Sequence, residues 1–274
     1  MIRSPIKWAG GKFRIRNRII ELIPDHNCYV EVFGGAGWVM FGKPPSSVEI
    51  FNDIDGELVN FFSVVKNKPR ELINSFDLEL VSREKFYKLR DLPSNELSNW
   101  TDVQRAHRFY YLIMASWGGE LGFARFQTSV SDNGSGNRLI GAINTLEQRI
   151  MPAYERLQTV IIENLPWEIC IERYDRPYGS NKVVMYLDPP YPGNRVNYQF
   201  NMKDIHDHRR LATILEGLGA RFLLTSYNLD EVKELFNHDR FNILEVEFSS
   251  GMRTNGKSNY KNKEIIVTNF DVQK

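Results

Sequence analysis

Residues 182–191 read KVVMYLDPPY, an apolar run that passes directly into an acid, two prolines and a tyrosine. The run is continuous rather than alternating, which is typical of a strand that helices bury on both faces. Open α/β sheets bind their ligands beyond the carboxyl ends of their parallel strands. The stretch therefore predicts a central strand with a ligand site at Asp188, Pro189, Pro190 and Tyr191.

Further strands are indicated by short apolar runs at 28–33, 46–51, 159–163, 221–225, 241–248 and 264–270. Helical periodicity lies between them, over 12–23, 55–66, 207–217 and 229–236. Asp55 is the expected N-cap of the helix over 55–66. The alternation of strands and helices predicts an α/β fold with a mostly parallel sheet.

The segment 57–140 interrupts this alternation, because it contains no convincing central strand. Residues 101–115 predict a helix that opens with a capping box of Thr101 and Gln104. Residues 117–141 are rich in Gly, Ser, Asn and Arg. A connection of this length inside an α/β domain is either functional or a separate subdomain. We expect a mainly helical insertion with an irregular, partly hairpin-like tip.

Composition favours an ordinary globular protein. The 274 residues suffice for one large domain or for a domain with an insertion, and 42% are apolar and 25% charged. No run is long and apolar enough to span a bilayer, and the basic N-terminus lacks the apolar core of a signal peptide. Cys28 and Cys170 have no partners at metal-ligand spacing, so reduced thiols and a cytoplasmic location are expected.

Charge is distributed unevenly, although the formal net charge is only +1. Residues 1–20 and 251–263 both contain several Lys and Arg residues and no acid. Such local patches suffice for phosphate binding, since charges further away than a Debye length do not cancel their field. Solvated protein faces carry similar charge, and the charge pattern alone favours that simpler interpretation.

The Asp-Pro-Pro-Tyr segment suits methyl transfer to the exocyclic nitrogen of adenine. This nitrogen is a poor nucleophile because its lone pair is delocalised into the ring. Two acceptors, the Asp188 carboxylate and the Pro189 carbonyl, would bind its two hydrogens and turn the lone pair toward a methyl group. The prolines stiffen the segment, and Tyr191 offers a face for stacking a flipped base. The alternative is a Pro-Pro turn with an Asp cap, which accounts for fewer of these features together.

Glycines follow the first predicted strand in the stretch EVFGGAG at 31–37. A glycine turn at a strand-to-helix junction lets the backbone approach a ligand closely. The dinucleotide fingerprint GxGxxG is not met, because Met40 occupies its third glycine position. Asp53 follows the second strand and is placed to accept bonds from ribose hydroxyls, whereas Asp55 is placed to cap the helix. A tight structural turn and a second capping acid are the alternatives.

The N-terminal KWAGGK at 7–12 partly resembles a phosphate-binding loop. It fails as one, because Ile6 and Phe13 stand where GxxxxGK[ST] needs Gly and Ser or Thr. A nucleoside triphosphatase is therefore not predicted. Trp8 would either line a ligand site or pack into the core, and both interpretations stand.

Five motifs occur in order along the chain: KWAGGK at 7–12, VEVFGGAG at 30–37, NDID at 52–55, DPPY at 188–191 and KEIIVTN at 263–269. In this order they resemble the Dam-like family of DNA adenine-N6 methyltransferases, over residues 1–60 and 150–270. The resemblance implies an α/β fold with a Rossmann-like, seven-stranded class I methyltransferase sheet. It also implies an inserted, mainly helical target-recognition domain at 57–140, with 1–56 and 141–274 as the cofactor-binding and catalytic parts of the catalytic domain.

The resemblance further implies a cofactor, S-adenosylmethionine, and no metal. Cofactor binding is expected at Trp8, Lys12, Glu31, Phe33, Gly34, Gly35, Asp53 and Asp188. Asp53 resembles the ribose ligand, Asp188 lies near the target amine as well, and Tyr191 resembles the tyrosine that stacks on the base. We expect DNA contacts from Lys7, Arg14, Arg125, Phe126, Gln127, Arg138 and Asn259.

The inserted segment departs from the family pattern. Family members that read GATC commonly carry a hairpin with an R-x-N-x-x-G-x-F-N-x-P-like pattern, whereas residues 122–138 here read GFARFQTSVSDNGSGNR. Arg125 and Gln127 suit base edges and Phe126 suits a wedge in a base stack, but packing and loop solvation explain them almost as well. GATC specificity is therefore not carried over to this chain.

These features together predict a site-specific DNA methyltransferase that flips an adenine out of double-stranded DNA and methylates its N6 atom. A monomer suffices for single-base methylation, and restriction–modification is one expected role beside an orphan or phage role. Two alternatives stay open: a methyltransferase acting on RNA bases or a protein amide, and a catalytically silent DNA-binding protein of the same fold. Cofactor binding and the nature of the methylated product distinguish them.

Overall fold

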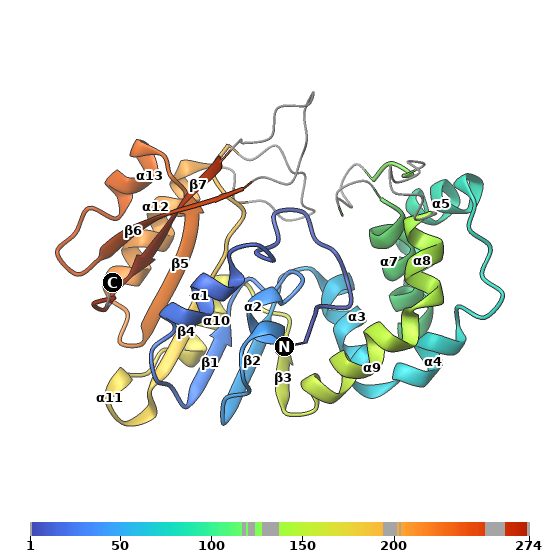
Figure 1. The fold of residues 1–274 in the computed structure, drawn as a ribbon, viewed down its shortest axis with the longest axis horizontal. Coiled ribbons are helices and arrows are strands. Elements are labelled where there is room, and N and C mark those ends of the chain that lie inside the picture. Colours follow the sequence, from blue (N-terminus) through green and yellow to red (C-terminus); the bar gives the residue numbers. More distant parts are fainter. Residues whose placement is uncertain are drawn as a thin grey trace.

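A computed structural model describes residues 2–116, 119, 124–127, 137–193, 202, 204–249 and 261–272. Its centre is a seven-stranded sheet with the order β3-β2-β1-β4-β5-β7-β6 (Figure 1). The strands are β1 Cys28–Glu31, β2 Val48–Asn52, β3 Val160–Glu163, β4 Val183–Leu187, β5 Arg221–Tyr227, β6 Asn242–Ser249 and β7 Lys261–Thr268. β7 is antiparallel to β5 and β6, and the other neighbours are parallel. The predicted α/β class with a Rossmann-like, mostly parallel sheet is confirmed.

Helices fill the connections between strands in the described part of the chain. They are α1 Arg16–Leu22, α2 Trp38–Gly42, α3 Gly56–Asn67, α4 Pro69–Asn74, α5 Arg83–Arg90, α6 Ser94–Leu97, α7 Asp102–Ala115, α8 Arg138–Asn144, α9 Leu146–Leu157, α10 Trp167–Tyr174, α11 Tyr178–Asn181, α12 Ile205–Glu216 and α13 Asp230–Leu235. Asp55 caps α3, and Thr101 forms a capping box with Gln104 at the start of α7. Both predicted caps are confirmed.

Two elements near the N-terminus are shorter than predicted. The helix expected over 12–23 begins at Arg16, because residues 13–15 form a turn and Ile15 at the N-cap has no side-chain acceptor. The strand expected over 28–33 ends at Glu31, because the glycine turn follows within three residues. Both shortened ends lie where the chain turns toward the carboxyl edge of the sheet.

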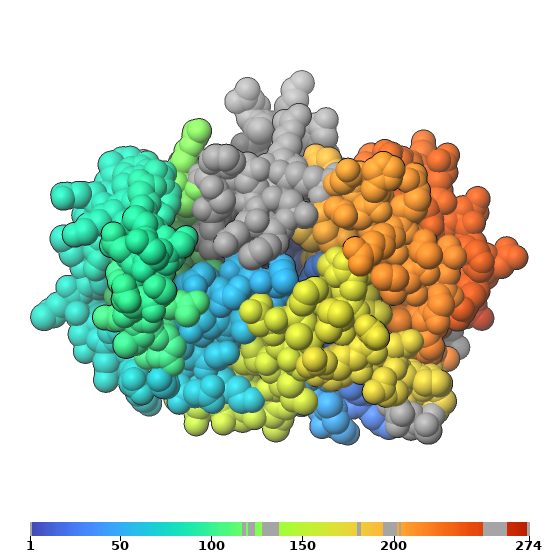
Figure 2. All heavy atoms as spheres, turned by 180° about the vertical axis from the view of Figure 1, so that it is seen from behind, coloured from blue at the N-terminus to red at the C-terminus, as the bar shows by residue number. Residues whose placement is uncertain are grey.

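Alternate residues of the central strands enter two separate cores. Tyr29, Phe51 and Tyr186 pack on the face covered by α1, α2, α3, α7 and α9. Val30 and Met185 pack on the opposite face, which α10, α12 and α13 cover. Figure 2 views this opposite face, with α10 and α12 in yellow and orange. Burial on both faces accounts for the continuous apolar runs from which the strands were predicted.

The described residues between 57 and 140 form helices and one isolated antiparallel bridge, between Ser116 and Phe126. α7 packs along α3, and α5 and α8 pack against α7. α9, which follows the predicted boundary at 140, packs against α3 and α4, and this helical layer flanks β3 (Figure 1). The division at 57 and 140 therefore stays a prediction. Within the described ranges, each helix is too short or too polar to span a bilayer.

Candidate active site

The candidate site lies at the carboxyl ends of β1, β2, β4 and β5, on the face covered by α1. Side chains alternate across a strand, so polar residues two positions apart share this face with the core residues. Asp188 lies one such step beyond Tyr186 of β4, and Thr225 lies one step beyond Leu223 of β5. The N-terminal segment before α1 lies over the same strand ends and brings Lys12 to them.

Asp188 is held by two donors on one carboxylate oxygen. Its Oδ1 atom lies 2.8 Å from Lys12 Nζ and accepts a 2.8 Å bond from the Thr225 hydroxyl. Tyr186 lies behind Thr225, with 3.3 Å between their hydroxyl oxygens. Among the described residues, Oδ2 has no hydrogen-bond partner. The carboxylate is therefore fixed in orientation, with one oxygen left to accept a further hydrogen.

Lys12 lies almost fully buried between two carboxylates. Its ammonium lies 2.8 Å from Asp188 Oδ1 and 3.9 Å from Glu264 Oε2, and it donates to the Gly10 carbonyl at 3.0 Å. It also lies 4.6 Å from the centroid of the Tyr191 ring. Burial alone would lower the pKa of Lys12, but the two carboxylates outweigh burial and raise it. Lys12 is therefore a fixed positive charge at the centre of the site.

Tyr191 is 5% exposed, and its hydroxyl is engaged by Glu264 of β7. The hydroxyl donates to Glu264 Oε2 at 2.9 Å. The ring meets Tyr227 of β5 edge to face, with 4.6 Å between centroids. Burial raises the pKa of Glu264, whereas the nearby Lys12 ammonium lowers it. The aromatic residue of DPPY is thus fixed both through its hydroxyl and through its ring.

The two prolines place the acceptors of the segment. The Pro190 carbonyl lies 3.1 Å from Nε2 of His208 in α12, and the Met202 carbonyl lies 2.8 Å from the same nitrogen. Two carbonyl partners require that Nε2 carries the proton. Burial lowers the pKa of His208, which favours the neutral ring. His208 therefore anchors the DPPY segment to α12 from the side opposite to Lys12.

The glycine turn after β1 is packed too tightly for larger residues. A Cβ atom on Gly34 would lie 2.3 Å from the Phe51 ring, and Gly35 has φ +48°. The Gly35 amide donates to Asp53 Oδ2 at 2.8 Å, while Asp53 Oδ1 accepts from the Asp55 amide at 2.9 Å. Burial raises the pKa of Asp53 to about 6, although these amide bonds oppose the increase. Asp53 thus joins the turns that follow β1 and β2.

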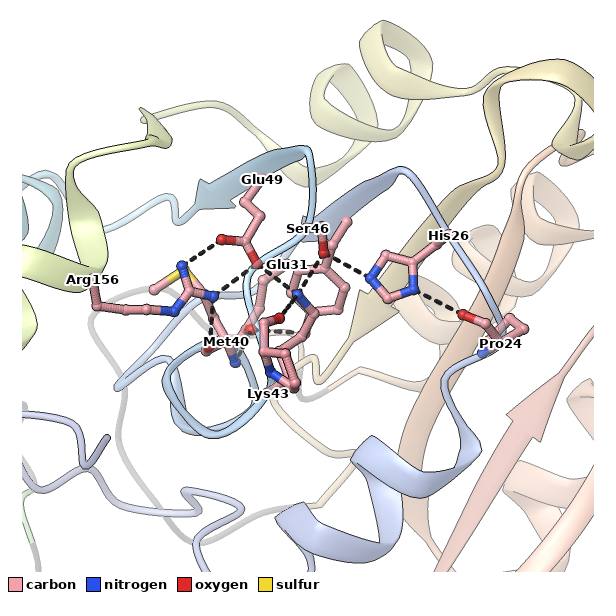
Figure 3. Close-up of polar contacts among 10 residues, drawn as sticks. Pro24, His26, Glu31, Met40, Lys43, Ser46, Glu49 and Arg156 are labelled. Carbon is pink, nitrogen blue, oxygen red and sulfur yellow. Dashed lines mark hydrogen bonds and ion pairs between the residues drawn. The ribbon is translucent and has the colours of Figure 1, made fainter. Parts of the chain in front are cut away.

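Glu31 ends β1 directly beside this turn. Its Oε2 atom accepts from the Tyr29 hydroxyl at 2.8 Å and from the Met40 amide of α2 at 2.9 Å. Burial raises the pKa of Glu31 to about 8, against the lowering effect of these two bonds. Figure 3 shows that the Met40 carbonyl is bound in turn by Arg156, at 2.9 Å. Met40 therefore anchors helix α2 at two points: its amide binds Glu31, and its carbonyl binds Arg156.

Trp8 packs into the protein, and its expected place in a ligand site stays a prediction. Its ring lies stacked near Phe109 of α7, with 6.4 Å between centroids, and it contacts the first core as a partly buried residue. A Cβ atom on Gly35 would lie 3.0 Å from Trp8 Nε1. Trp8 thus packs against the helical layer and borders the glycine turn. Phe33 stacks near Trp167 of α10, with 6.4 Å between centroids.

The residues expected to contact DNA differ in their surroundings. Lys7 donates to the Ser116 carbonyl and, at 3.5 Å, to Gln127 Oε1. Burial, together with the charge of Arg138, lowers the pKa of Lys7 to about 8. Arg14 and Arg125 are exposed, and Asn259 lies outside the described residues. The structure therefore brings Lys7 and Gln127 together at the base of the predicted tip, with Arg138 close enough to affect the charge of Lys7.

Phe126 is engaged in packing. Its ring meets Phe86 of α5 with 5.5 Å between centroids, and the Arg83 guanidinium lies 5.5 Å from its centroid. It also pairs with Ser116 in the isolated bridge. Packing is therefore the arrangement of Phe126 in this structure, and its role as a wedge in DNA stays a prediction.

Among the site residues absent from the predicted set, Thr225, Tyr227 and Glu264 contact Asp188 or Tyr191 directly. Each lies on a strand that the apolar runs predicted, and each reaches the site only because of strand order. β5 neighbours β4, and β7 pairs with β5 so that Glu264 lies opposite Tyr227. A single acid at the start of the apolar run EIIVTNF was the available signal for Glu264, since an acid is rarely buried without a partner.

Comparisons with known proteins agree with this geometry. The family described as D12 class N6 adenine-specific DNA methyltransferase matches residues 8–252. The type II methyltransferase M1.LlaDCHI of Lactococcus lactis subsp. cremoris is 27% identical, over 98% of this chain and 96% of its own length. The type II methyltransferase M.MjaIII of Methanocaldococcus jannaschii is 29% identical, over 89% and 91%. The DNA adenine methylase of Escherichia coli K12 is 26% identical, over 97% and 94%.

The family match spans the glycine turn, the helical layer and the DPPY segment, and the sheet around them has the expected seven strands. Membership of such a family implies that the chain acts on adenine in DNA and uses a methyl donor. The chain belongs to the family of D12 class N6-adenine-specific DNA methyltransferases.

Proposed function

We propose that this protein transfers a methyl group from S-adenosylmethionine to N6 of an adenine flipped out of double-stranded DNA. The observation that carries the proposal is the Asp188 carboxylate. Lys12 and Thr225 occupy its Oδ1 atom, none of the described residues binds its Oδ2 atom, and we assign Oδ2 to a hydrogen of the target amine. A fixed acceptor beside a rigid Pro-Pro segment is what an amine of low nucleophilicity requires.

The residues around the glycine turn fit the proposed cofactor by their chemistry. Glu31 is a buried carboxylate and Asp53 a partly buried one on either side of the turn, and both accept hydrogen bonds from hydroxyl or amide donors. Such acids suit an ammonium group and ribose hydroxyls, because an added donor offsets the cost of their burial. When bound, S-adenosylmethionine supplies an electrophilic methyl group on a sulfonium sulfur. We assign Trp8, Lys12, Phe33, Gly34 and Gly35 to the remainder of its site.

Methyl transfer then depends on how the chain holds the adenine amine. Asp188 Oδ2 accepts one N–H, and the Pro189 carbonyl accepts the other. With both hydrogens held, the nitrogen becomes pyramidal and its lone pair points at the methyl group. Tyr191 provides an aromatic surface beside the base, and a proton leaves N6 after transfer. Lys12 and Thr225 keep the carboxylate from rotating out of this alignment.

We further propose that the helical segment 57–140 is the target-recognition domain. Lys7, Arg125, Gln127 and Arg138 supply basic or amide groups in or beside this segment, and we assign exposed Arg14, in the turn before α1, to the same role, since phosphate contacts position a duplex. One flipped base needs one active site, so we propose that the protein acts as a monomer. We also propose that it acts in the cytoplasm. Two relatives are named type II methyltransferases, which supports a role in restriction–modification.

The test of the proposed function is methyl transfer from labelled S-adenosylmethionine to unmethylated genomic DNA. Nucleoside analysis identifies the product, and single-molecule mapping locates the modified positions. We expect N6-methyladenine at one short motif. Transfer to RNA or protein instead of DNA would show that the proposed substrate is wrong. An absence of S-adenosylmethionine binding would show that the proposed methyltransferase activity is wrong.

Cofactor binding is expected to release a proton from Glu31. The raised pKa of about 8 keeps Glu31 mostly protonated at pH 7, and a cationic ligand group beside it favours the ionised form. Titration calorimetry at pH 7 in buffers of different ionisation enthalpy measures the protons released when S-adenosylhomocysteine binds. We expect about one proton fewer from Glu31→Gln than from the wild type, because glutamine cannot ionise. Equal proton release from both proteins would contradict this assignment.

The same pKa also predicts how stability depends on pH without ligand. Glu31 has a folded pKa above its unfolded value of 4.5, so the folded protein retains a proton that the unfolded chain loses. Its contribution to stability is therefore fully present below pH 4.5 and is lost as the pH rises toward about 8. Urea unfolding between these limits should show a steeper fall for the wild type than for Glu31→Gln.

A further inference from the structure

Glu264 is a buried acid whose described partners both belong to predicted site motifs. It lies on β7 opposite Tyr227 and is 8% exposed. Its Oε2 atom accepts from the Tyr191 hydroxyl of DPPY at 2.9 Å and lies 3.9 Å from the Lys12 ammonium of KWAGGK. A buried carboxylate needs a counter-charge or hydrogen bonds to offset its desolvation, and one neighbouring base can supply both. Glu264 instead joins two segments far apart in the sequence.

The charge of Glu264 changes the net charge of the groups around the reacting atoms. Lys12 is the cation shared by Asp188 and Glu264, so these three groups together carry a net charge of −1 when ionised. Without Glu264, Lys12 would neutralise Asp188 alone, and the net charge would be zero. Positive charge passes from the methyl donor to the amine during transfer, and a negative site stabilises that charge where it develops. The second carboxylate therefore supplies what the Lys12–Asp188 pair lacks.

Its hydrogen bond also fixes the ring of DPPY. Three groups hold Tyr191: Glu264 accepts a hydrogen bond from its hydroxyl, Tyr227 packs edge to face with its ring, and the Lys12 ammonium lies 4.6 Å from the ring centroid. A ring held at three points cannot follow a base that enters at a different angle. The arrangement is preorganised before substrate arrives, which is the condition for efficient electrostatic catalysis.

We propose that Glu264 is a positioning residue for methyl transfer: its carboxylate fixes Tyr191 and shares the charge of the Lys12 ammonium with Asp188. Asp188 thereby retains the acceptor strength that the adenine amine needs. This role rests on the proposed function, because it acts through the residues assigned to adenine. Glu264 itself touches neither the methyl donor nor the base.

The test measures the single-turnover rate of methyl transfer with saturating cofactor and DNA. We expect Glu264→Gln, which keeps a hydrogen-bond acceptor for Tyr191 but loses the charge, to be about 10- to 100-fold slower. Glu264→Asp restores the charge at a shorter reach and should recover part of that rate. Tyr191→Phe removes only the hydroxyl bond and should be several-fold slower. Glu245→Gln is the matched control, because Glu245 is an exposed acid on neighbouring β6 that pairs with Lys233.

Binding measurements separate positioning from general damage. Affinity for S-adenosylhomocysteine and for duplex DNA should change less than about threefold in Glu264→Gln, and thermal unfolding should remain cooperative. A single-turnover rate equal to that of the wild type would overturn the role of Glu264. So would a loss of rate that matches the loss of folded protein, or no recovery in Glu264→Asp. A wild type that methylates no adenine in DNA would instead overturn the proposed function.

Discussion

Replacing Asp188 by asparagine is expected to slow methyl transfer by about 10³-fold, because the substitution reverses one hydrogen-bonding group at the reacting amine. The amide oxygen would take the place of Oδ1, where Lys12 and Thr225 both donate. The amide NH₂ would then stand in place of Oδ2 and present hydrogens to the hydrogens of adenine N6. A donor at this position repels the substrate that the carboxylate accepts, so the variant loses more than a charge.

The measurement is again single-turnover methyl transfer, with binding of cofactor and DNA determined separately. Asp239→Asn makes the same chemical change at an exposed position between α13 and β6 and should retain the wild-type rate. Asp188→Asn should still bind duplex DNA, because phosphate contacts lie elsewhere. If Asp188→Asn turned over within tenfold of the wild type, the carboxylate would not be the acceptor for the amine.

The central strands were predictable because their residues are buried on both faces. Runs such as VVMYL at 183–187 need no partner to be recognised, since helices on both sides require apolar residues at every position. The caps of α3 and α7 were predictable for a similar reason, because a cap joins residues only two or three positions apart. These elements depend mainly on residues that are close together in the sequence, so the sequence alone suffices to predict them.

Contacts across the sheet were not predictable in the same way. Glu264 reaches Tyr191 across 73 positions of sequence, and the pairing depends on β7 entering the sheet antiparallel between β5 and β6. Lys12 could be assigned to the cofactor by its motif, but its 2.8 Å contact with Asp188 follows from the path of the segment before α1. Spacing alone carries no information on such pairs, because many strand orders are compatible with the same runs.

A cluster of charged side chains that the sequence did not reveal lies beside the glycine turn. Glu49 of β2 receives two bonds from Arg156 of α9 and lies 2.5 Å from the Lys43 ammonium (Figure 3). The three side chains are 0%, 3% and 2% exposed, respectively. Lys43 also donates to Ser46, which lies 2.7 Å from His26 Nε2. The cluster thus extends from a buried ion group to a histidine near the surface.

Glu49→Gln is expected to lower the free energy of unfolding by about 3–5 kcal/mol, which is the typical effect of removing one partner from a buried ion pair. The reason is that Lys43 and Arg156 would remain buried with no counter-charge between them. Arg156 already has one guanidinium nitrogen, Nε, buried with no hydrogen-bond partner among the described residues. Urea unfolding monitored by fluorescence and by circular dichroism measures the change and tests whether the transition remains two-state.

Glu147→Gln is the matched control for this prediction. Glu147 pairs with Arg70 at the surface, where both side chains are more than half exposed, so the loss should stay within about 1 kcal/mol. A double variant, Glu49→Leu with Arg156→Met, removes the charge together with its main partner and should be less destabilised than Glu49→Gln. If Glu49→Gln lowered the free energy of unfolding no more than Glu147→Gln does, burial would not determine how much this cluster contributes to stability.

The cluster also helps to hold helix α2, which follows the glycine turn, because Arg156 binds the Met40 carbonyl while Glu31 binds the Met40 amide. Loss of Glu49 frees Arg156 to move, and the Met40 backbone then loses one of its two side-chain contacts and keeps the one with Glu31. Glu49→Gln should therefore weaken S-adenosylhomocysteine binding by several-fold even at temperatures where the protein is fully folded, whereas Glu147→Gln should not. Isothermal titration well below the unfolding transition separates the two effects. Unchanged affinity in a folded Glu49→Gln protein would confine the cluster to stability and leave the geometry of the turn to Glu31 and Asp53 alone.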